Sequence, residues 1–231
     1  MIKISIKENL EHVNENITNA LRRSGRNDSV QLIAVSKTVD TDRIREAISY
    51  GVTDIGENKV QELDSKISEL GDIVNFHMIG TLQTNKVKYI IDRVKLIHSL
   101  DRISLAKELD KRAKQNNIII DTLIQVNVAK EETKSGFTVE EVIPFIEEAI
   151  TLDNIKIRGL MTIAPNSEDI NLLRNVFRTL YELKEDIKGR NYKEINMDFL
   201  SMGMTHDYEI AIEEGSNMIR VGTGIFGKRN Y

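Results

Sequence analysis

Short apolar runs rich in β-branched residues alternate along the chain with longer segments in which apolar residues recur at helical spacing. This alternation is typical of repeated βα units that build a parallel sheet. It predicts eight strands, at residues 31–36, 53–56, 75–79, 93–98, 118–127, 156–161, 196–202 and 217–221. Eight such units fit a (β/α)8 TIM barrel, an α/β fold in which residues 1–231 form a single domain.

Amphipathic patterns around the strands predict the helices. The clearest helix follows Ser167, a natural N-cap, ends at Gly189, and has an apolar face formed by Leu173, Val176, Phe177, Leu180, Leu183 and Ile187. Another opens near Asp101 and is expected to bury Leu105, Leu109 and Ala113. Before the first strand, an extra N-terminal helix that covers the flank of the last strand is predicted from Leu10, Val13, Ile17 and Leu21.

A proline complicates one predicted helix. Thr138 is a suitable N-cap, and Glu141, three residues later, completes a capping box. Pro144 then falls inside the helix, where proline lacks an amide hydrogen and clashes with the preceding turn. The sequence therefore predicts either a kink or a later start of this helix.

Composition narrows the classes of protein. The chain contains no cysteine, which excludes disulfides, a thiolate nucleophile and cysteine-ligated metal sites. Lysine and arginine total 32 against 36 acidic residues, and the net charge of −4 offers no general attraction for nucleic acid or an anionic membrane. The first residues mix charges and lack the apolar run of a signal peptide, and no apolar stretch is long enough to span a membrane. We expect a cytoplasmic protein.

One lysine lies where a barrel binds its ligands. Side chains alternate along the first strand, so Ile33, Val35 and Lys37 share a face and Lys37 lies at the C-terminal end. TIM barrels bind ligands at this end of their strands. Partial desolvation would leave the lysine amine neutral and able to form a Schiff base with an aldehyde. The alternative is an ordinary solvated lysine.

The last strand supplies candidates for the rest of a ligand. Arg220 lies among apolar residues and needs a partner. Opposite a pyridine nitrogen it would keep that nitrogen unprotonated, while a salt bridge at the rim is the alternative. The glycines of Gly222-Thr223-Gly224 let backbone amides converge on an anion, although the segment is also consistent with a simple turn.

The seventh strand leads into further polar groups. It ends in Ser201-Met202-Gly203-Met204-Thr205, before a helix predicted from Asp207 to Glu214, so hydroxyls and helix-start amides gather where such barrels bind phosphate. Thr205 also suits an N-cap. His77, Asn58 and Asn85 are each open to two interpretations, a ligand contact or a structural hydrogen bond. Together, a strand-end lysine and this anion site suit a phosphorylated aldehyde.

Eight sequence motifs follow one another along nearly the whole chain. They are AVSKT (34–38), GENKVQE (56–62), HMIGTLQTNK (77–86), HSLDR (98–102), KSGF (134–137), RGLMTI (158–163), LSMGMTHD (200–207) and RVGTGIFG (220–227). In this order they resemble the motifs of the pyridoxal phosphate homeostasis protein family, a single-domain relative of the alanine racemase N-terminal barrel.

The resemblance implies how pyridoxal 5′-phosphate (PLP) would be held. Lys37 would carry PLP as a Schiff base, and Arg220 would face its pyridine nitrogen. Around the phosphate would lie Ser201, Thr205, Gly222 and Thr223, and the ring would be lined by Asn58, His77 and Met204. The family usually shows Met-Ser where this chain has Met204-Thr205, a difference that keeps the hydroxyl and adds a methyl group.

The resemblance also favours one function over two others. It implies a protein that stores PLP reversibly and passes it to PLP-dependent apo-enzymes by transient contact, with little or no turnover. We also expect a monomer with no metal, nucleic acid or membrane partner. The alternative is a PLP-dependent amino-acid racemase, which needs two opposed bases. In alanine racemase the second base comes from a C-terminal β-domain, whereas this chain stops at Tyr231. A Schiff-base aldolase is disfavoured, because such aldolases commonly carry their lysine on a later strand.

Overall fold

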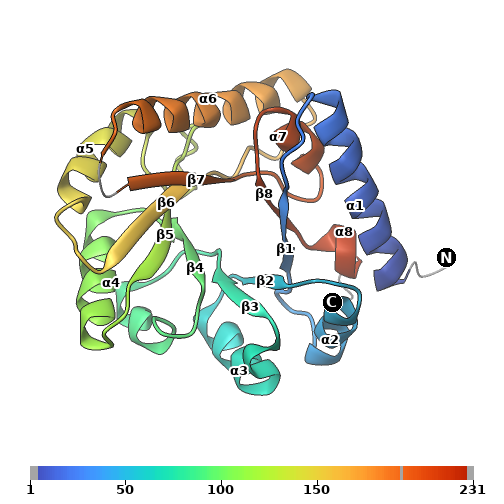
Figure 1. Cartoon of the computed structure of the whole chain (residues 1–231), viewed down its shortest axis with the longest axis horizontal. Coiled ribbons are helices and arrows are strands. Elements are labelled where there is room, and N and C mark those ends of the chain that lie inside the picture. Colours follow the sequence, from blue (N-terminus) through green and yellow to red (C-terminus); the bar gives the residue numbers. More distant parts are fainter. Residues whose placement is uncertain (1–4, 193–194, 228–231) are drawn as a thin grey trace.

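Eight parallel strands close into a barrel in the computed structural model, which describes residues 5–192 and 195–227. The strands are β1 (Gln31–Val35), β2 (Asp54–Glu57), β3 (Asn75–Met78), β4 (Leu96–Leu100), β5 (Ile120–Gln125), β6 (Ile155–Met161), β7 (Ile195–Ser201) and β8 (Met218–Val221). Each strand pairs with the next, and β1 also pairs with β8, so the sheet has no open edge (Figure 1). The predicted (β/α)8 TIM barrel is confirmed.

All eight predicted strands overlap observed strands, and the fourth differs most. It was predicted at residues 93–98, but β4 begins at Leu96 and continues to Leu100. The reason is a turn in which the Arg93 amide donates to the carbonyl oxygen of Ile90 at 3.0 Å. An apolar residue directly after this turn, Val94, extends the strand-like pattern toward the N-terminus.

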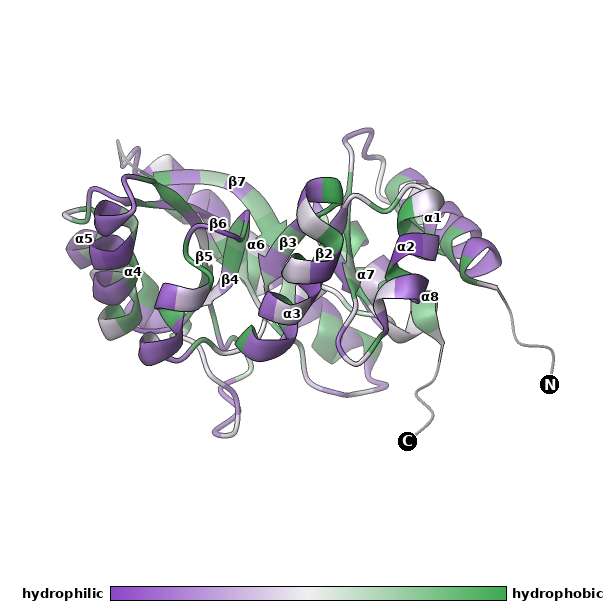
Figure 2. Cartoon of the chain, turned by 90° about the horizontal axis from the view of Figure 1, so that it is seen from below, coloured by the Kyte–Doolittle hydropathy of each residue, from purple (hydrophilic) through white to green (hydrophobic). Residues whose placement is uncertain are grey.

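Helices surround the barrel and connect most of its strands. They are α1 (Ile6–Arg23), α2 (Thr41–Ser49), α3 (Val60–Leu70), α4 (Ile103–Gln115), α5 (Val139–Ala149), α6 (Ile170–Gly189), α7 (Tyr208–Glu213) and α8 (Thr223–Phe226). Two 3-10 segments, η1 (Gly71–Ile73) and η2 (Thr84–Tyr89), precede β3 and β4. Figure 2 shows that the helices carry both hydrophilic and hydrophobic residues, as expected for elements with one buried face. No helix in residues 5–192 or 195–227 is long and apolar enough to cross a membrane.

The predicted N-terminal helix is confirmed as α1. Its first turn is fixed by a capping box in which the Ser5 amide donates to Glu8 Oε2 at 2.9 Å. The helix buries Leu10, Val13 and Ile17, as predicted, and packs against α7 and α8 beside the last strand (Figure 1). The fourth position of the predicted stripe, Leu21, is only partly buried at the edge of the core.

Helix α5 begins where the capping box predicts. The Thr138 amide donates to Glu141 Oε2 at 2.8 Å, and the helix then continues through Pro144. The predicted later start is therefore wrong, because the capping box fixes the first turn ahead of the proline. Pro144 leaves the Glu140 carbonyl without its usual helical donor, since proline has no amide hydrogen.

The boundaries of α6 differ slightly from the prediction. Its N-cap is Asp169, whose carboxylate accepts from the amides of Asn171 and Leu172. The hydroxyl of Ser167, two residues before Asp169, accepts from the Asp169 amide. Gly189 is the last residue of the helix. The left-handed residue that follows is Asn191, with φ of 54°, so an asparagine supplies the conformation that the prediction assigned to glycine.

The apolar core has two layers. A small cluster drawn from five strands fills part of the barrel interior: Ile33, Leu96, Leu123, Met161 and Met218. The larger layer lies between the strands and the helices, and includes the buried stripe of every long helix. Because apolar side chains fill only part of the interior, buried polar side chains occupy the remainder.

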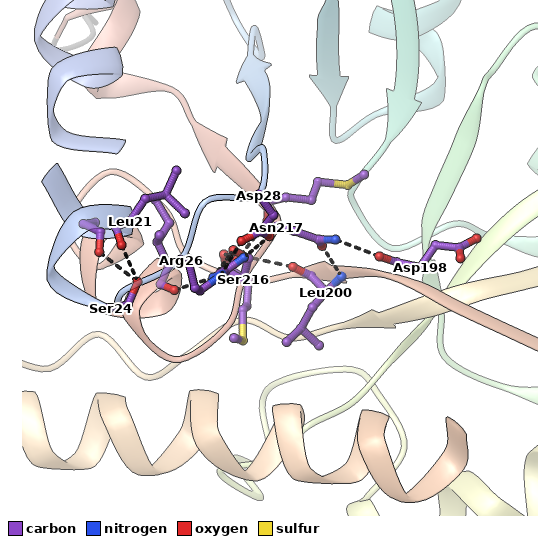
Figure 3. A network of polar contacts seen from close by, with 12 residues as sticks. Leu21, Ser24, Arg26, Asp28, Asp198, Leu200, Ser216 and Asn217 are labelled. Carbon is purple, nitrogen blue, oxygen red and sulfur yellow. Dashed lines mark hydrogen bonds and ion pairs between the residues drawn. The ribbon is translucent and has the colours of Figure 1, made fainter. Parts of the chain in front are cut away.

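Side chains reinforce the junction of β7 and β8. The Asn217 side chain accepts from the amide of Leu200 at 2.7 Å and donates to the carbonyl of Asp198 at 2.7 Å (Figure 3). Next to it, the buried hydroxyl of Ser216 lies 2.8 Å from the carbonyl oxygen of Met202. These contacts satisfy backbone groups of β7 at a place where the strands share little backbone pairing.

Candidate functional site

Lys37 lies at the C-terminal end of β1, as the strand pattern predicted. It follows Val35 by two positions, and its side chain is half-buried. The next residue, Thr38, has φ of 64°, a left-handed conformation that is rare for β-branched residues. The Thr38 amide donates to the carboxylate of Glu62 on α3. The lysine is therefore held in a tight, strained turn at the barrel end where ligands bind.

A buried acid–base pair anchors Ser36, the residue before Lys37. The Ser36 hydroxyl donates to Glu57 Oε1 at 2.5 Å, and its carbonyl accepts from Lys66 Nζ at 2.6 Å. Lys66 Nζ also lies 2.6 Å from Glu57 Oε1. Burial raises the pKa of Glu57, against the opposing effect of Lys66, and Glu57 Oε2 is buried without a hydrogen-bond partner. The pair fixes the backbone on which Lys37 stands.

Arg220, on β8, is buried inside the barrel. The residue is only 3% exposed. The alternative considered from the sequence, a salt bridge at the rim of the barrel, is therefore wrong. Nη1 donates to the carbonyl and hydroxyl oxygens of Ser201 at 2.9 and 2.6 Å, and Nη2 donates to the Thr162 carbonyl at 2.8 Å. Burial lowers the pKa of Arg220 to about 10, while the charge of Asp207 acts in the opposite direction. The guanidinium stays charged at neutral pH, and two of its five N–H groups lie outside these three contacts.

The loops after β7 and β8 meet, as the anion-site prediction required. The Gly224 amide donates to Thr205 Oγ1 at 3.3 Å, which joins the two loops directly. A Cβ atom at Gly222 would lie 3.2 Å from the Val35 carbonyl oxygen, so the glycine allows this loop to approach β1 closely. Thr223 is exposed and Thr205 is partly exposed. Two hydroxyls therefore stand at an accessible junction between β1, β7 and β8.

Ser201 and His77 are more deeply placed than the other predicted residues. Ser201 Oγ lies 2.6 Å from Arg220 Nη1 and 3.0 Å from His98 Nδ1. The two ring nitrogens of His77 lie 2.9 Å from His98 Nε2 and 2.9 Å from Asp54 Oδ1. Both side chains are buried and have protein partners, so the structural interpretation of His77 is the one its contacts support.

Asn58 and Met204 lie at the accessible end of the barrel. Asn58 follows β2 and is partly exposed; it packs so closely on Gly80 that a Cβ there would lie 2.4 Å from the Asn58 carbonyl oxygen. Met204 is 37% exposed after β7. Neither Asn58 nor Asn85 is the N-cap of the helix next to it: Lys59 is the N-cap of α3, and Asn85 lies within the 3-10 segment η2.

Three buried polar residues of this region were missed by the sequence predictions. Asp54 and His98 contact His77, and the Thr162 carbonyl accepts from Arg220. A signal for His98 existed: it stands between Ile97 and Ser99 in a strand that is buried throughout, where a polar side chain needs a partner. It meets His77 on the neighbouring strand β3 and Ser201 on β7, and only the closed barrel brings β7 within reach.

Comparison with known proteins places the chain in a family. A family model described as alanine racemase, N-terminal domain, matches residues 9–230. A protein of Aquifex aeolicus (strain VF5) named pyridoxal phosphate homeostasis protein is 47% identical over 226 residues, which cover 97% of this chain and 98% of the relative. A protein of Vibrio alginolyticus with the same name is 39% identical over 233 residues, covering 98% and 99%.

Solved structures support the same assignment. PipY of Synechococcus elongatus PCC7942, solved with PLP bound, has a TM-score of 0.84 and 32% identity, and the match covers 96% of this chain and 100% of that chain. Alanine racemase of Clostridium difficile 630 has a TM-score of 0.76 at 13% identity, with 57% of its chain covered, a likeness that shows the fold alone. The chain belongs to the pyridoxal phosphate homeostasis protein family, whose barrel is that of the alanine racemase N-terminal domain.

Proposed function

We propose that this protein binds PLP at the C-terminal end of the barrel and acts in PLP homeostasis by holding and releasing the cofactor. The observation that carries the proposal is the convergence of Lys37, Arg220 and the joined loops of Thr205 and Gly224 around one end of the barrel. Relatives named for PLP homeostasis, and PipY solved with PLP bound, support it. PLP supplies an aldehyde, which condenses reversibly with a lysine amine.

The donor set fits the three polar parts of PLP. Lys37 offers the amine for the aldehyde, at the end of β1. Arg220 can only donate hydrogen bonds, so opposite a pyridine nitrogen it favours the unprotonated form of that nitrogen. Hydroxyls of Thr205 and Thr223 and the backbone at Gly222 suit a phosphate group. The residue types at this end of the barrel therefore match the cofactor.

The other predicted site residues take different roles in this proposal. Asn58 and Met204, both accessible, line the space for the ring. Ser201 contacts Arg220, and His77 contacts Asp54, so their polar atoms are already bonded to buried protein groups. In this proposal the two residues support the site and do not line the ligand. Thr205 has one methyl group more than the serine that is usual in the family. Its hydroxyl still accepts from the Gly224 amide and so keeps its place in the loop junction.

We favour a carrier over a racemase. The relatives that match nearly the full chain are named homeostasis proteins, whereas the match to alanine racemase covers 57% of that chain. We further propose that the protein works in the cytoplasm as a monomer and passes PLP to apo-enzymes through transient contacts.

An absorption titration tests the binding proposal. Purified protein and its Lys37→Ala variant are mixed with PLP, reduced with borohydride and digested for mass spectrometry, with Lys59→Ala, which removes an exposed lysine, as the matched control. We expect a visible absorption band and label on Lys37 in the wild type and in Lys59→Ala, and neither in Lys37→Ala. Absence of the band in the wild type, or label on other lysines alone, contradicts the proposal.

The same preparation separates the carrier from the racemase. PLP-loaded protein is incubated with single enantiomers of amino acids, and the optical purity is followed by chiral chromatography. A carrier gives no enzyme-like racemisation. Turnover of about 1 s⁻¹ or faster, within the usual range of enzymes, establishes the racemase instead.

A further inference from the structure

A chain of hydrogen bonds between buried side chains crosses the inside of the barrel. Arg220 Nη1 lies 2.6 Å from Ser201 Oγ, which lies 3.0 Å from His98 Nδ1. His98 Nε2 lies 2.9 Å from His77 Nδ1, and His77 Nε2 lies 2.9 Å from Asp54 Oδ1. These five residues come from β8, β7, β4, β3 and β2 and are at most 4% exposed. The chain links the arginine on β8 to a carboxylate on β2, two strands away around the barrel.

Both imidazoles of this chain are neutral. Burial lowers the pKa of His98 well below its ordinary value, and the positive charge of Arg220 acts in the same direction. Burial also lowers the pKa of His77, against the opposing effect of Asp54. Burial by itself would raise the pKa of Asp54, but hydrogen bonds from His77 and Thr53 lower it overall, so Asp54 is ionised.

These protonation states fix the direction of every hydrogen bond. Ionised Asp54 can only accept, so His77 donates from Nε2 and accepts at Nδ1. His98 must then donate from Nε2 and accept at Nδ1, because a neutral imidazole has one donor and one acceptor. Ser201 therefore donates to His98 and accepts from Arg220. All the hydrogen atoms point from the arginine toward the carboxylate, an arrangement in which neighbouring hydrogen bonds strengthen one another.

The direction matters because the direct partners of Arg220 are uncharged oxygens of Ser201 and Thr162. A buried guanidinium needs compensation for its lost hydration. Asp54, which also accepts from Lys95 Nζ at 3.1 Å, ends the polarised chain, and this polarisation makes the Ser201 hydroxyl a stronger acceptor. The same hydroxyl donates its hydrogen to His98, so it can only accept from Arg220 Nη1.

We propose that the chain from Asp54 to Ser201 positions Arg220, so that Asp54 influences PLP affinity without touching the ligand. This inference rests on the proposed function, in which Arg220 meets the pyridine nitrogen. His77 and His98 are then positioning residues that act through Ser201. A barrel interior usually excludes buried polar residues. In this proposal the four in the chain all support one functional arginine.

Nuclear magnetic resonance of the ligand-free protein tests the chain itself. With ¹⁵N-labelled histidine, both His77 and His98 are expected as neutral Nε2–H tautomers across the neutral pH range, whereas the exposed His12 and His206 serve as references. A protonated ring or an Nδ1–H tautomer at either buried position overturns the proposed direction. This measurement involves no PLP, so it stands whether or not the proposed function holds.

Substitution tests the effect on PLP. Asp54→Asn keeps an oxygen that accepts from His77 and removes the charge; Asp121→Asn makes the same change in β5, at an ion pair with Arg158. We expect Asp54→Asn to bind PLP about tenfold more weakly, as for loss of one charge-assisted hydrogen bond. The ¹⁵N signal of the pyridine nitrogen in labelled PLP should also shift, which a purely structural change elsewhere would not cause. Asp121→Asn should bind like the wild type.

The outcomes distinguish the two proposals. If the wild type binds PLP and Asp54→Asn binds equally well with an unchanged pyridine signal, the positioning role is wrong and the proposed function survives. If the wild type gives no absorption band with PLP, the proposed function fails, whatever the tautomers are. Circular dichroism of each variant confirms that it is folded before affinities are compared.

Discussion

At the scale of single residues, burial decides which polar groups carry charge. His77 and His98 lie against each other with ring centroids 5.2 Å apart, and burial lowers the pKa of both. Glu57, also buried, has a raised pKa but keeps Lys66 within 2.6 Å. The sequence predicted one of these residues as a ligand contact and left the others without a role. Each of them is better understood from its contacts than from its residue type.

The buried histidines make stability depend on pH. Unfolded histidine takes up a proton near pH 6.5, but folded His98 stays neutral, so its contribution to stability is present above that pH and is lost as the pH falls. Urea unfolding between pH 7.5 and 5 should show that His98→Gln flattens this loss by up to about 1.4 kcal/mol per pH unit. His206→Gln, at an exposed histidine, should follow the wild type. Equal slopes for His98→Gln and the wild type would contradict the neutral state.

The buried pair beside Lys37 predicts a large loss when its cation is removed. Lys66→Met leaves Glu57 buried with a hydrogen bond from Ser36 but without its cation, and should lower the free energy of unfolding by about 3 kcal/mol or more. Adding Glu57→Gln should recover much of this loss. Lys59→Met, at an exposed lysine, should change stability by less than about 0.5 kcal/mol. Denaturant unfolding at pH 7 measures all three, and a Lys66→Met protein as stable as the wild type would show that the pair is not structural.

At the scale of elements, the shortest strand register of the barrel is the one between β7 and β8. The Asn217 side chain bonds the backbone amide of Leu200 and the backbone carbonyl of Asp198 on β7 (Figure 3). This junction lies directly before Arg220 and after the strand that carries Ser201. A polar loop residue therefore holds two strands of the candidate site together.

This junction predicts a specific loss of stability. Asn217→Ala leaves the Leu200 amide without its acceptor and should lower the free energy of unfolding by about 1–3 kcal/mol. Asn171→Ala, an exposed asparagine in the first turn of α6, is the matched control and should have little effect. Thermal and urea unfolding measure both. A neutral Asn217→Ala would show that β7 and β8 need no side-chain bridge.

At the scale of the whole molecule, the candidate site exists only in the closed barrel. Lys37 and Arg220 are separated by most of the chain, yet β1 and β8 are paired neighbours in which Ile33 lies opposite Arg220. A ligand held by both strands binds the folded protein and not the unfolded one. Binding of PLP should therefore stabilise the fold.

Thermal unfolding measures this coupling. With PLP at about a hundred times its dissociation constant, the gain is about 2.7 kcal/mol, which for a chain of this size raises Tm by roughly 5–10 °C. Lys37→Ala should lose most of the gain, and an analogue of PLP without the aldehyde should give a smaller one. A Tm that PLP raises equally in Lys37→Ala would place the ligand elsewhere.

The fold was predictable because the apolar pattern of each βα unit depends on residues close together in the sequence. Strand and helix periodicities gave the eight strands and the N-terminal helix, and errors were confined to boundaries such as the start of β4 and the N-cap of α6. Those errors arose where a turn or a competing cap, and not the apolar pattern, set the boundary. Helix α5 begins at its capping box and continues through Pro144, so the later start, one of the two expected effects of the proline, does not occur.

What the sequence determined by itself was the order of elements, the position of Lys37 at a strand end and the motifs that mark the family, because these depend on neighbours within a few residues. Only the tertiary structure decided which polar groups meet. His98 reaches Ser201 from the opposite side of the barrel, across 103 positions of sequence, and this contact gives Arg220 its support. Such contacts follow from strand closure and register, which local patterns do not encode.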